Sequence, residues 1–464
     1  MLKQNIKEHL DYYCIIGLGA SGIATAMQFN KHGIKYKIIE SNNKPGGVWQ
    51  SNKTSKFIYK ELITNTSKFS LFLEGYPHPE EVDYYMTPHY LQFYLSNIVD
   101  QEINEEDIIY NTTVQSVILL NEDCWQVIDQ NDVSYKFKGI VVCSGNVHIP
   151  QFHNDVFKHK TIKQIHSMDY KGLETIQGKN VIVIGSGQSA IDIITTGIIH
   201  AKKIIHCTRK IPGWRLAAEK NLEGVKRELI IYDFINKVPK AIKGLDKTVL
   251  LIRKTYSKFL RLLLPQYISK YLFSKKIFNT TKSLKLYNWE KRFSLKIFPV
   301  TKKFLWQYAN SRKVVTKKAI KDIKGNNVIF EDGTIDKSID IIIHATGYQQ
   351  SFHFIKQKDL IFNKENVQDA LHGLYFGFLP KIKGIYFIGQ LYPFGPHWVL
   401  FTIQAKLVAA CIKSKLSHDK LIDLFKNDCS ALKYSVFNYG KDYSSYVDIN
   451  RYLKQGKRYL KIIN

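Results

Sequence analysis

Two glycine-rich turns, each lying between an apolar run and a segment with helical spacing, constrain this chain more than any other feature. The first follows the run YYCIIG at residues 12–17, leads into SGIATAMQFNKHG, and is followed by a second run, YKIIE. The same order returns within residues 180–209, where NVIVIG leads into SGQSAIDIITTGII and then into KKIIHCTR. A strand, a glycine turn, a helix and another strand make up a parallel-sheet nucleotide-binding unit. We therefore predict an α/β fold with two Rossmann-like dinucleotide-binding domains.

The first turn matches the pattern G-x-G-x-x-G. In this pattern the first glycine permits a tight turn, the second lets the backbone approach a pyrophosphate, and the third allows close packing of helix on strand. Eighteen residues after Gly22, Glu40 ends the next strand, where a carboxylate accepts hydrogen bonds from a ribose diol. The predicted dinucleotide-binding residues of this unit are Gly17, Gly19, Ala20, Ser21, Gly22 and Glu40.

The second turn has alanine, Ala190, in the third position, which the pattern tolerates. The acid expected after the following strand is absent, and a hydroxyl and two cations stand there instead. Cations at this place suit a ribose 2′-phosphate and favour NADPH over NADH, although they also fit a merely basic surface. The predicted binding residues of this unit are Gly185, Gly187, Gln188, Ser189, Thr208, Arg209 and Lys210.

Four further segments, together with the two turns, resemble the flavin-containing monooxygenases. They are Gly46–Trp49 (GGVW), Thr64–Lys68 (TNTSK), Ala345–Tyr348 (ATGY) and Gly384–Gln390 (GIYFIGQ), and the resemblance runs in order from Tyr12 to about Trp398. It implies FAD at the first turn, NADPH at the second, and dioxygen activated as a C4a-hydroperoxyflavin that oxygenates a soft nitrogen or sulfur nucleophile of a small molecule. It gives Asn65 the place of the family's active-site asparagine. It adds to the cofactor-binding residues Gly47, Trp49, Thr64, Gly389 and Gln390.

The chain departs from the family in its identifying segment, F-x-G-x-x-x-H-x-x-x-[FY]. His166 and Tyr170 keep the second half, whereas Lys160 and Ile162 replace the phenylalanine and the glycine. Because this segment links the two domains in the family, its loss weakens a prediction of domain coupling more than one of cofactor identity. We expect a structural role for His166.

Other flavoproteins remain as alternatives. Baeyer–Villiger monooxygenases share the two-nucleotide architecture, but they continue G-G-x-W with a Pro-Gly and a later Asp, and carry Trp where Tyr170 stands. The chain reads GGVWQSNKTSKFIYKELITNTSK instead, which favours the N- and S-oxygenating branch. An NADPH oxidase flavoprotein also stays open. A dithiol reductase is disfavoured, because the six cysteines form no C-x-x-C pair, and no metal site is expected for the same reason.

The spacing of the motifs predicts the domain limits. Residues 1–160 form the first part of the FAD domain, 161–345 the NADPH domain, and 346–464 the second part of the FAD domain with C-terminal helices. Residues from about 212 to 299 are rich in helix formers and are predicted to be a helical insertion in the NADPH domain.

Positive charge is concentrated in this insertion. The formal net charge is +27, and residues 237–296 hold sixteen Lys or Arg against two acids. Such a surface attracts anionic membranes or other polyanions, so we consider reversible peripheral membrane binding beside the simpler interpretation of a solvated face. A basic nucleic-acid-binding protein is a remote alternative. The N-terminus shows no apolar signal region and the chain no membrane-length apolar run, so a cytoplasmic enzyme is expected, with its oligomeric state open.

Overall fold

The structure is a computed structural model, and it divides the chain into two compact units. The first unit comprises Met1–Ile58, Leu62–Pro150 and Tyr348–Asn464, and the second comprises Tyr59–Glu61 and Gln151–Gly347. The sequence predicted crossings at 160/161 and 345/346; the chain crosses at 150/151 and 347/348, and visits the second unit once more at residues 59–61. The residues described are 6–50, 57–145, 149–152, 161–208, 213–216, 297–300, 304, 307–308, 310–349, 351–356, 382–390, 392–393, 397–426, 446–447 and 449–463.

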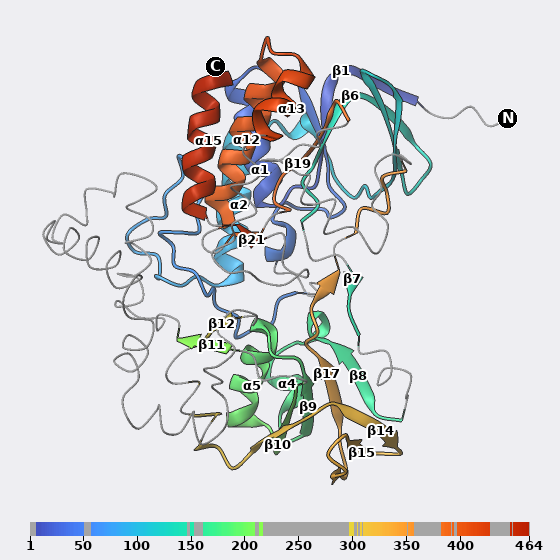
Figure 1. The fold of residues 1–464 in the computed structure, drawn as a ribbon, viewed down its shortest axis with the longest axis vertical. Coiled ribbons are helices and arrows are strands. Elements are labelled where there is room, and N and C mark those ends of the chain that lie inside the picture. Colours follow the sequence, from blue (N-terminus) through green and yellow to red (C-terminus); the bar gives the residue numbers. More distant parts are fainter. Residues whose placement is uncertain are drawn as a thin grey trace, which may run out of the picture. The chain divides into compact units, whose positions relative to one another are not determined.

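The first unit is built on a seven-stranded sheet in the order β3-β2-β1-β6-β5-β4, with β19 beside β6 (Figure 1). Pairs among β3, β2, β1, β6 and β19 are parallel, and β4-β5-β6 is an antiparallel meander. The strands are β1 (Ile6–Ile16), β2 (Tyr36–Ile39), β3 (Ile108–Ile109), β4 (Val114–Asn121), β5 (Cys124–Asp129), β6 (Ser134–Val142) and β19 (Ile385–Phe387). The helices are α1 (Ala20–Lys31), α2 (Pro88–Glu102), α12 (His397–Lys413), α13 (His418–Lys426) and α15 (Ile449–Ile463).

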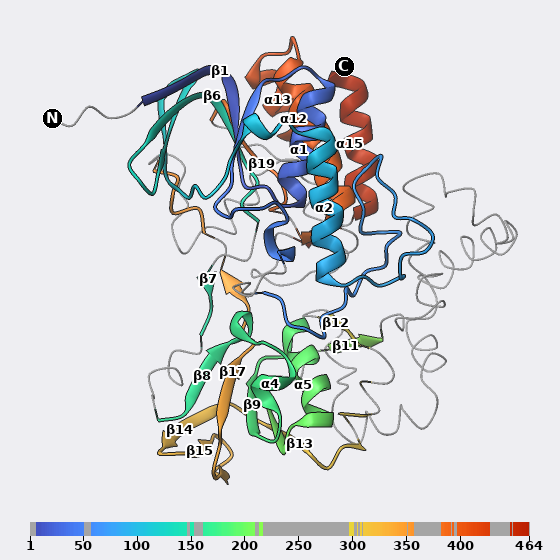
Figure 2. The same ribbon diagram turned by 180° about the vertical axis from the view of Figure 1, so that it is seen from behind.

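Strand β1 shows why this sheet is covered on both faces. Tyr13 and Ile15 pack in one cluster with buried residues of α1, α2 and α12, whereas Cys14 and Ile16 pack in a second cluster on the other face with Trp125. Alternation of this kind follows from the two-residue period of a strand. Figures 1 and 2 show α1, α2, α12 and α15 side by side. The strand begins at Ile6 rather than at residue 12, because its first residues pair with β6 while their polar side chains stay largely exposed.

The second unit is built on a five-stranded, all-parallel sheet in the order β13-β10-β9-β17-β8. Its strands are β8 (Lys163–His166), β9 (Asn180–Ile184), β10 (Lys203–Cys207), β13 (Val314–Lys317) and β17 (Ile341–His344), and its helices are α4 (Leu173–Ile176) and α5 (Gln188–His200). Strand β17 consists of the four residues IIIH, all of them buried. Both units thus have the Rossmann-type arrangement predicted from the two turns.

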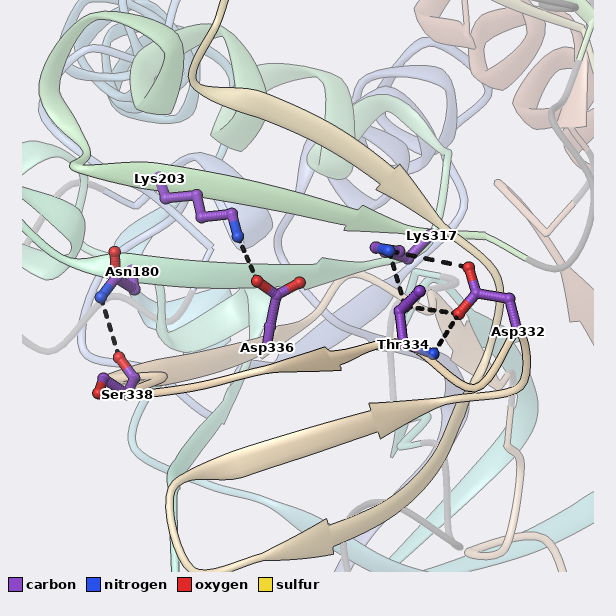
Figure 3. A network of polar contacts seen from close by, with 7 residues as sticks. All are labelled: Asn180, Lys203, Lys317, Asp332, Thr334, Asp336 and Ser338. Carbon is purple, nitrogen blue, oxygen red and sulfur yellow. Dashed lines mark hydrogen bonds and ion pairs between the residues drawn. The ribbon is translucent and has the colours of Figure 1, made fainter.

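A small antiparallel sheet of β14 (Ile320–Lys324), β15 (Asn327–Phe330) and β16 (Ile335–Asp336) is joined to this parallel sheet by polar contacts. Figure 3 shows Lys203 of β10 paired with Asp336 of β16, and Lys317 of β13 with Asp332. The side-chain amide of Asn180 donates to the carbonyl of Ser338. These contacts fix the edge of the sheet on which β10 and β13 lie.

Two short strands lie near the ends of the predicted helical insertion. They are β11 (Gly213–Leu216) and β12 (Ile297–Val300), which pair in parallel, and residues 217–296 between them lie outside the described residues. The sequence IFPV is rich in strand-forming residues, and its neighbours obscured that signal. The basic stretch 237–296 lies outside the described residues. Within the part of the chain that the structure describes, no helix is long and apolar enough to cross a membrane.

Candidate active site

The first glycine turn joins β1 to α1, and its backbone leaves no room for side chains at two positions. Gly17 has φ +101°, and a Cβ there would lie 2.8 Å from the carbonyl oxygen of Cys143. A Cβ on Gly22 would lie 2.0 Å from the carbonyl oxygen of Gly17. The turn is therefore tight and the helix lies close on the strand, as these glycines require.

A second pair of glycines, Gly46 and Gly47, lies against this turn. The amide of Gly46 donates to the carbonyl of Leu18 at 3.0 Å, and a Cβ on Gly47 would lie 3.1 Å from the Cα of Gly19. Gly19 is the N-cap of α1 and supplies no capping side chain. Two glycines thus face each other at a helix N-terminus that receives no side-chain cap from its N-cap residue, which suits a diphosphate.

Neighbouring residues complete the surroundings of this turn. Ala20 and Ser21 are buried in the first turn of α1, and the half-buried Trp49 packs against the apolar cluster beneath. Gly389, with φ +85°, approaches Ser21 so closely that a Cβ there would lie 3.1 Å from the Cβ of the serine. Gln390 is buried beside it. The structure therefore brings the GIYFIGQ segment to the first turn, although the two lie far apart in the sequence.

Glu40 holds the turn in place from the end of β2. Its side chain is only 4% exposed, and its Oε2 accepts a hydrogen bond from the amide of Leu18 at 2.6 Å. Its Oε1 accepts from the amide and the side-chain nitrogen of Asn42, at 2.9 and 2.7 Å. The carboxylate is thus fixed and oriented by the chain itself. Sequence reasoning missed Asn42, because an asparagine in a turn carries no specific signal.

The second turn has the same construction between β9 and α5. Gly185 has φ +120°, and a Cβ there would lie 2.2 Å from the carbonyl oxygen of Ala345. Gly187 is the N-cap of α5 and again supplies no capping side chain. Ser189 is exposed in the first helical turn, and Ala190 is fully buried. The Oε1 of Gln188 is buried and has no hydrogen-bond partner in the described part of the chain, so an acceptor is left for a ligand donor.

Backbone hydrogen bonds show which residue replaces the missing acid. Gly17 donates to the carbonyl of Ile39, and Gly185 donates in the same way to Cys207, so Thr208 occupies the place of Glu40. The hydroxyl of Ser186 donates to the Oγ1 of Thr208 at 2.9 Å. Arg209 and Lys210 lie outside the described residues.

A buried histidine that sequence reasoning missed supports the second turn from below. His206 is 0% exposed, and its Nε2 donates to the carbonyl of Gly185 at 2.8 Å. Its Nδ1 accepts from the hydroxyl of Tyr308 at 2.7 Å, and that hydroxyl also contacts Thr316 Oγ1 at 2.7 Å. Burial lowers the pKa of His206 to about 4, opposed by the bond to Gly185, so the ring is neutral at pH 7. Nothing in the sequence indicates a special role for this histidine, because it is a single residue within an apolar strand.

The TNTSK segment belongs to the first unit, where its two ends are fixed. Thr64 is buried and exchanges two hydrogen bonds with Met86, one through its amide and one through its hydroxyl. Lys68 is 5% exposed and donates from Nζ to three carbonyls, those of Pro79, Glu80 and Val82, at 2.6 to 3.0 Å. Burial lowers its pKa, although acidic neighbours oppose the shift.

Asn65 lies between these two anchors and is exposed. Its Oδ1 accepts from the hydroxyl of Thr66 at 3.2 Å. The flanking contacts hold the backbone around an accessible amide that has both donor and acceptor atoms.

The incomplete family segment lies in the second unit. His166 is fully buried, its Nδ1 accepts from the amide of Met168 at 3.2 Å, and its Nε2 donates to the carbonyl of Gly347 at 3.1 Å. Both ring nitrogens are used inside the fold, which accords with the structural role expected. Ile162 is buried in an apolar cluster beneath the sheet, so this chain fills with a side chain the place where the family has glycine.

Comparison with known proteins gives a consistent result. The model of the family described as flavin-binding monooxygenase-like matches residues 12–238 and 234–448. The chain is 26% identical to flavin-containing monooxygenase 3 of Macaca mulatta over 94% of this chain and 81% of that protein. Its structure resembles that of S-allyl-L-cysteine S-oxygenase from Allium sativum, with a TM-score of 0.64, 18% identity, and coverage of 97% and 88% of the two chains. It also resembles cyclohexanone monooxygenase bound to epsilon-caprolactone, with a TM-score of 0.69, 16% identity, and coverage of 97% and 96%.

Proposed function

The chain belongs to the flavin-binding monooxygenase-like family, and from this premise we propose that it uses FAD and NADPH to transfer one oxygen atom of dioxygen to a soft nitrogen or sulfur nucleophile of a small molecule. It is a flavin-dependent monooxygenase. The observation that carries the proposal is the pair of uncapped helix N-termini at bare glycine turns, combined with a fixed TNTSK segment. Likeness of fold alone does not choose the substrate class, since the S-oxygenase and cyclohexanone monooxygenase are both similar to this chain.

The residues around the first turn fit FAD. Gly19 and Gly47 leave a backbone cradle that a side chain would narrow, and the uncapped α1 N-terminus accommodates the diphosphate. Glu40 supplies a buried carboxylate at the end of β2, where the ribose of a dinucleotide lies in this fold. When bound, the flavin supplies the redox chemistry that activates dioxygen.

The residues around the second turn fit NADPH. The uncapped N-terminus of α5 and the turn at Gly185 provide the diphosphate site, and the free Oε1 of Gln188 provides an acceptor. Thr208 places a neutral hydroxyl where the carboxylate of Glu40 stands in the first unit, so this position does not repel a 2′-phosphate. Arg209 and Lys210 follow directly in the sequence and are proposed to pair with it.

The role proposed for Asn65 is to hydrogen-bond in the active site, so that the activated oxygen passes to the substrate and is not released as H2O2. Its exposed amide is held between two anchored residues, so the loss of the side chain leaves the loop in place. Asn65→Ala is therefore expected to retain FAD and reduction by NADPH, while O2 consumption shifts toward H2O2. Coupling to oxygenated product at the native level would contradict this role.

The proposed reaction is tested by incubating the protein with NADPH, O2 and matched probes: a tertiary amine, a sulfide and a ketone. We expect oxygenated product from the amine or the sulfide in proportion to the NADPH consumed. Product from the ketone alone would assign the protein to ketone oxygenation. Stoichiometric H2O2 with all three probes would make it an oxidase.

A further inference from the structure

The three residues Tyr59–Glu61 are an excursion of the chain into the second unit, and we call them the strap. The chain belongs to the first unit up to Ile58 and again from Leu62. Its first residue, Tyr59, packs on elements of the second unit, among them α5, whose first residues form the second glycine turn. It is thus a covalent link from the TNTSK segment to the unit proposed to bind NADPH.

Tyr59 fixes one end of the strap to α5. Its hydroxyl donates to Asp192 Oδ2 at 2.9 Å, and its ring packs edge-on against Tyr170 with centroids 5.2 Å apart. Burial, and next the charge of Asp192, raise the pKa of Tyr59, so the hydroxyl remains a donor. A half-buried tyrosine hydroxyl paired with a carboxylate makes a charge-assisted hydrogen bond, which is stronger than a neutral one.

Glu61, at the other end of the strap, lies beside a glycine of the second unit. Its carboxylate lies over Gly172, where a Cβ would come within 2.1 Å of Oε2. Gly172 has φ +89°, so this position favours glycine for its backbone as well as for the space it leaves.

Asp192 touches the second glycine turn as well as the strap. It lies four residues after Gln188 on the same face of α5, and its Oδ1 accepts from the Gln188 side-chain nitrogen at 3.3 Å. The carboxylate of Asp192 therefore accepts one hydrogen bond from Gln188, a residue of the proposed NADPH site, and another from Tyr59 of the strap. A ligand that moves or orders Gln188 therefore acts on Asp192, and Asp192 holds Tyr59.

The connection from the strap to Asn65 is short. Only Leu62 and Ile63 separate Glu61 from Thr64, and three peptide steps span at most about 11 Å. Thr64 is anchored by its two hydrogen bonds to Met86. Because Tyr59 is bonded to Asp192 and Thr64 to Met86, a displacement of Tyr59 reaches the turn that carries Asn65 through only four intervening residues.

We propose that the Tyr59–Glu61 strap couples occupancy of the second glycine turn to the ordering of the Thr64–Lys68 turn, with Tyr59 and Asp192 as positioning residues. This inference rests on the proposed function, because it takes NADPH or NADP⁺ as the ligand of the second turn. The strap supplies a coupling element in a chain whose family linker segment is incomplete. Its consequence is that nucleotide binding at one turn prepares the Asn65 turn for the oxygenation step.

The test is amide hydrogen exchange of the full-length holoprotein with and without NADP⁺. In the native protein we expect NADP⁺ to slow exchange both at Gly185–Ala190 and at Leu62–Lys68. In Tyr59→Phe, which removes one hydroxyl, the slowing at Gly185–Ala190 persists while at least about half of that at Leu62–Lys68 is lost, because ordering is transmitted through the broken contact. The affinity for NADP⁺ falls by less than about tenfold, as for one hydrogen bond.

Matched variants distinguish coupling from general destabilisation. Tyr135→Phe removes a buried tyrosine hydroxyl that donates to Asp129 at 3.1 Å in the first unit, and it is expected to leave the NADP⁺ effect unchanged. Asp192→Ala is expected to lose the slowing at Leu62–Lys68 as Tyr59→Phe does, and it also removes the acceptor of Gln188. Asp192→Asn keeps an acceptor for Tyr59 and is expected to restore most of the coupling. Tyr59→Phe also raises the H2O2 share of NADPH oxidation by about twofold or more without slowing flavin reduction, a split that loss of structure does not produce.

The outcomes separate the inference from its premise. Full NADP⁺-dependent slowing at Leu62–Lys68 in Tyr59→Phe overturns the strap and leaves the proposed function intact. The same holds if NADP⁺ protects only Gly185–Ala190 in the native protein. Absence of any protection at Gly185–Ala190 contradicts nucleotide binding at the second turn, and the strap proposal falls with it.

Discussion

The two glycine turns have the same backbone and are supported by different chemistry. In the first unit a buried carboxylate, Glu40, accepts the amide of Leu18 at the turn. In the second unit Thr208 stands in that place, and the carbonyl of Gly185 is held from below by the neutral imidazole of His206. The second unit thus lacks the carboxylate that supports the first turn, and a buried histidine supports its turn instead. We propose that the missing acid makes room for a 2′-phosphate.

The largest effect on stability is expected from exchanging the residues at the third glycine position of the two patterns, Gly22 and Ala190. A Cβ at Gly22 would lie 2.0 Å from the Gly17 carbonyl oxygen, so Gly22→Ala forces the backbone apart and is expected to cost at least about 3 kcal/mol of unfolding free energy. Ala190→Gly, the reciprocal change in α5, is expected to cost only about 1 kcal/mol. Thermal unfolding and FAD content measure both. Equal losses in the two variants would show that the turns are not differentiated at this position.

The next effect concerns the proposed 2′-phosphate site. Loss of a charge-assisted phosphate contact costs roughly 1.5 to 3 kcal/mol per bond, or about ten- to a hundredfold. Arg209→Ala combined with Lys210→Ala is therefore expected to narrow the preference for NADPH over NADH, chiefly through a raised KM for NADPH. Steady-state kinetics with both nucleotides provide the measurement. An unchanged ratio would place the phosphate contact on other residues.

A smaller effect is expected from His206. Replacing it with Phe leaves the carbonyl of Gly185 without its donor, which costs about 1 kcal/mol and raises the KM for NADPH roughly fivefold. FAD content is expected to stay at the native level. His206→Gln, which retains a donor amide, serves as the matched control, and an equal loss in both variants would assign the effect to packing instead.

The same histidine predicts a dependence of stability on pH. Its pKa is lowered from 6.5 to about 4, so between these values the unfolded chain binds more protons than the folded one. This contribution is fully present above pH 6.5 and is lost as the pH falls toward 4. Denaturant unfolding of the native protein and His206→Phe across this range should show a shallower slope for the variant. Parallel curves would mean that His206 does not titrate as inferred.

Much of this site was predictable because glycine spacing reports backbone geometry directly. Gly17, Gly22 and Gly185 lie where a side chain would collide with backbone, as the motif requires. The partners that hold the turns were not predictable, since His206 and Asn42 are single polar residues in ordinary contexts. The strap was also invisible, because three residues without a repeat or motif leave no periodic signal. The short strands β11 and β12 near the ends of the predicted helical insertion were not foreseen, because the helix-forming composition of the stretch outweighed four-residue strand signals.

The most direct test of the account is a paired measurement of cofactor binding after the same substitution in each turn. Gly19 and Gly187 are the N-caps of α1 and α5, and valine at either place obstructs the approach of a diphosphate. We predict that Gly19→Val loses most of its FAD, and that Gly187→Val keeps FAD at the native level while its affinity for NADP⁺ falls at least about tenfold. Circular dichroism checks that both variants are folded. Full FAD occupancy in Gly19→Val, or loss of FAD in Gly187→Val, would contradict the assignment of FAD to the first turn and NADPH to the second.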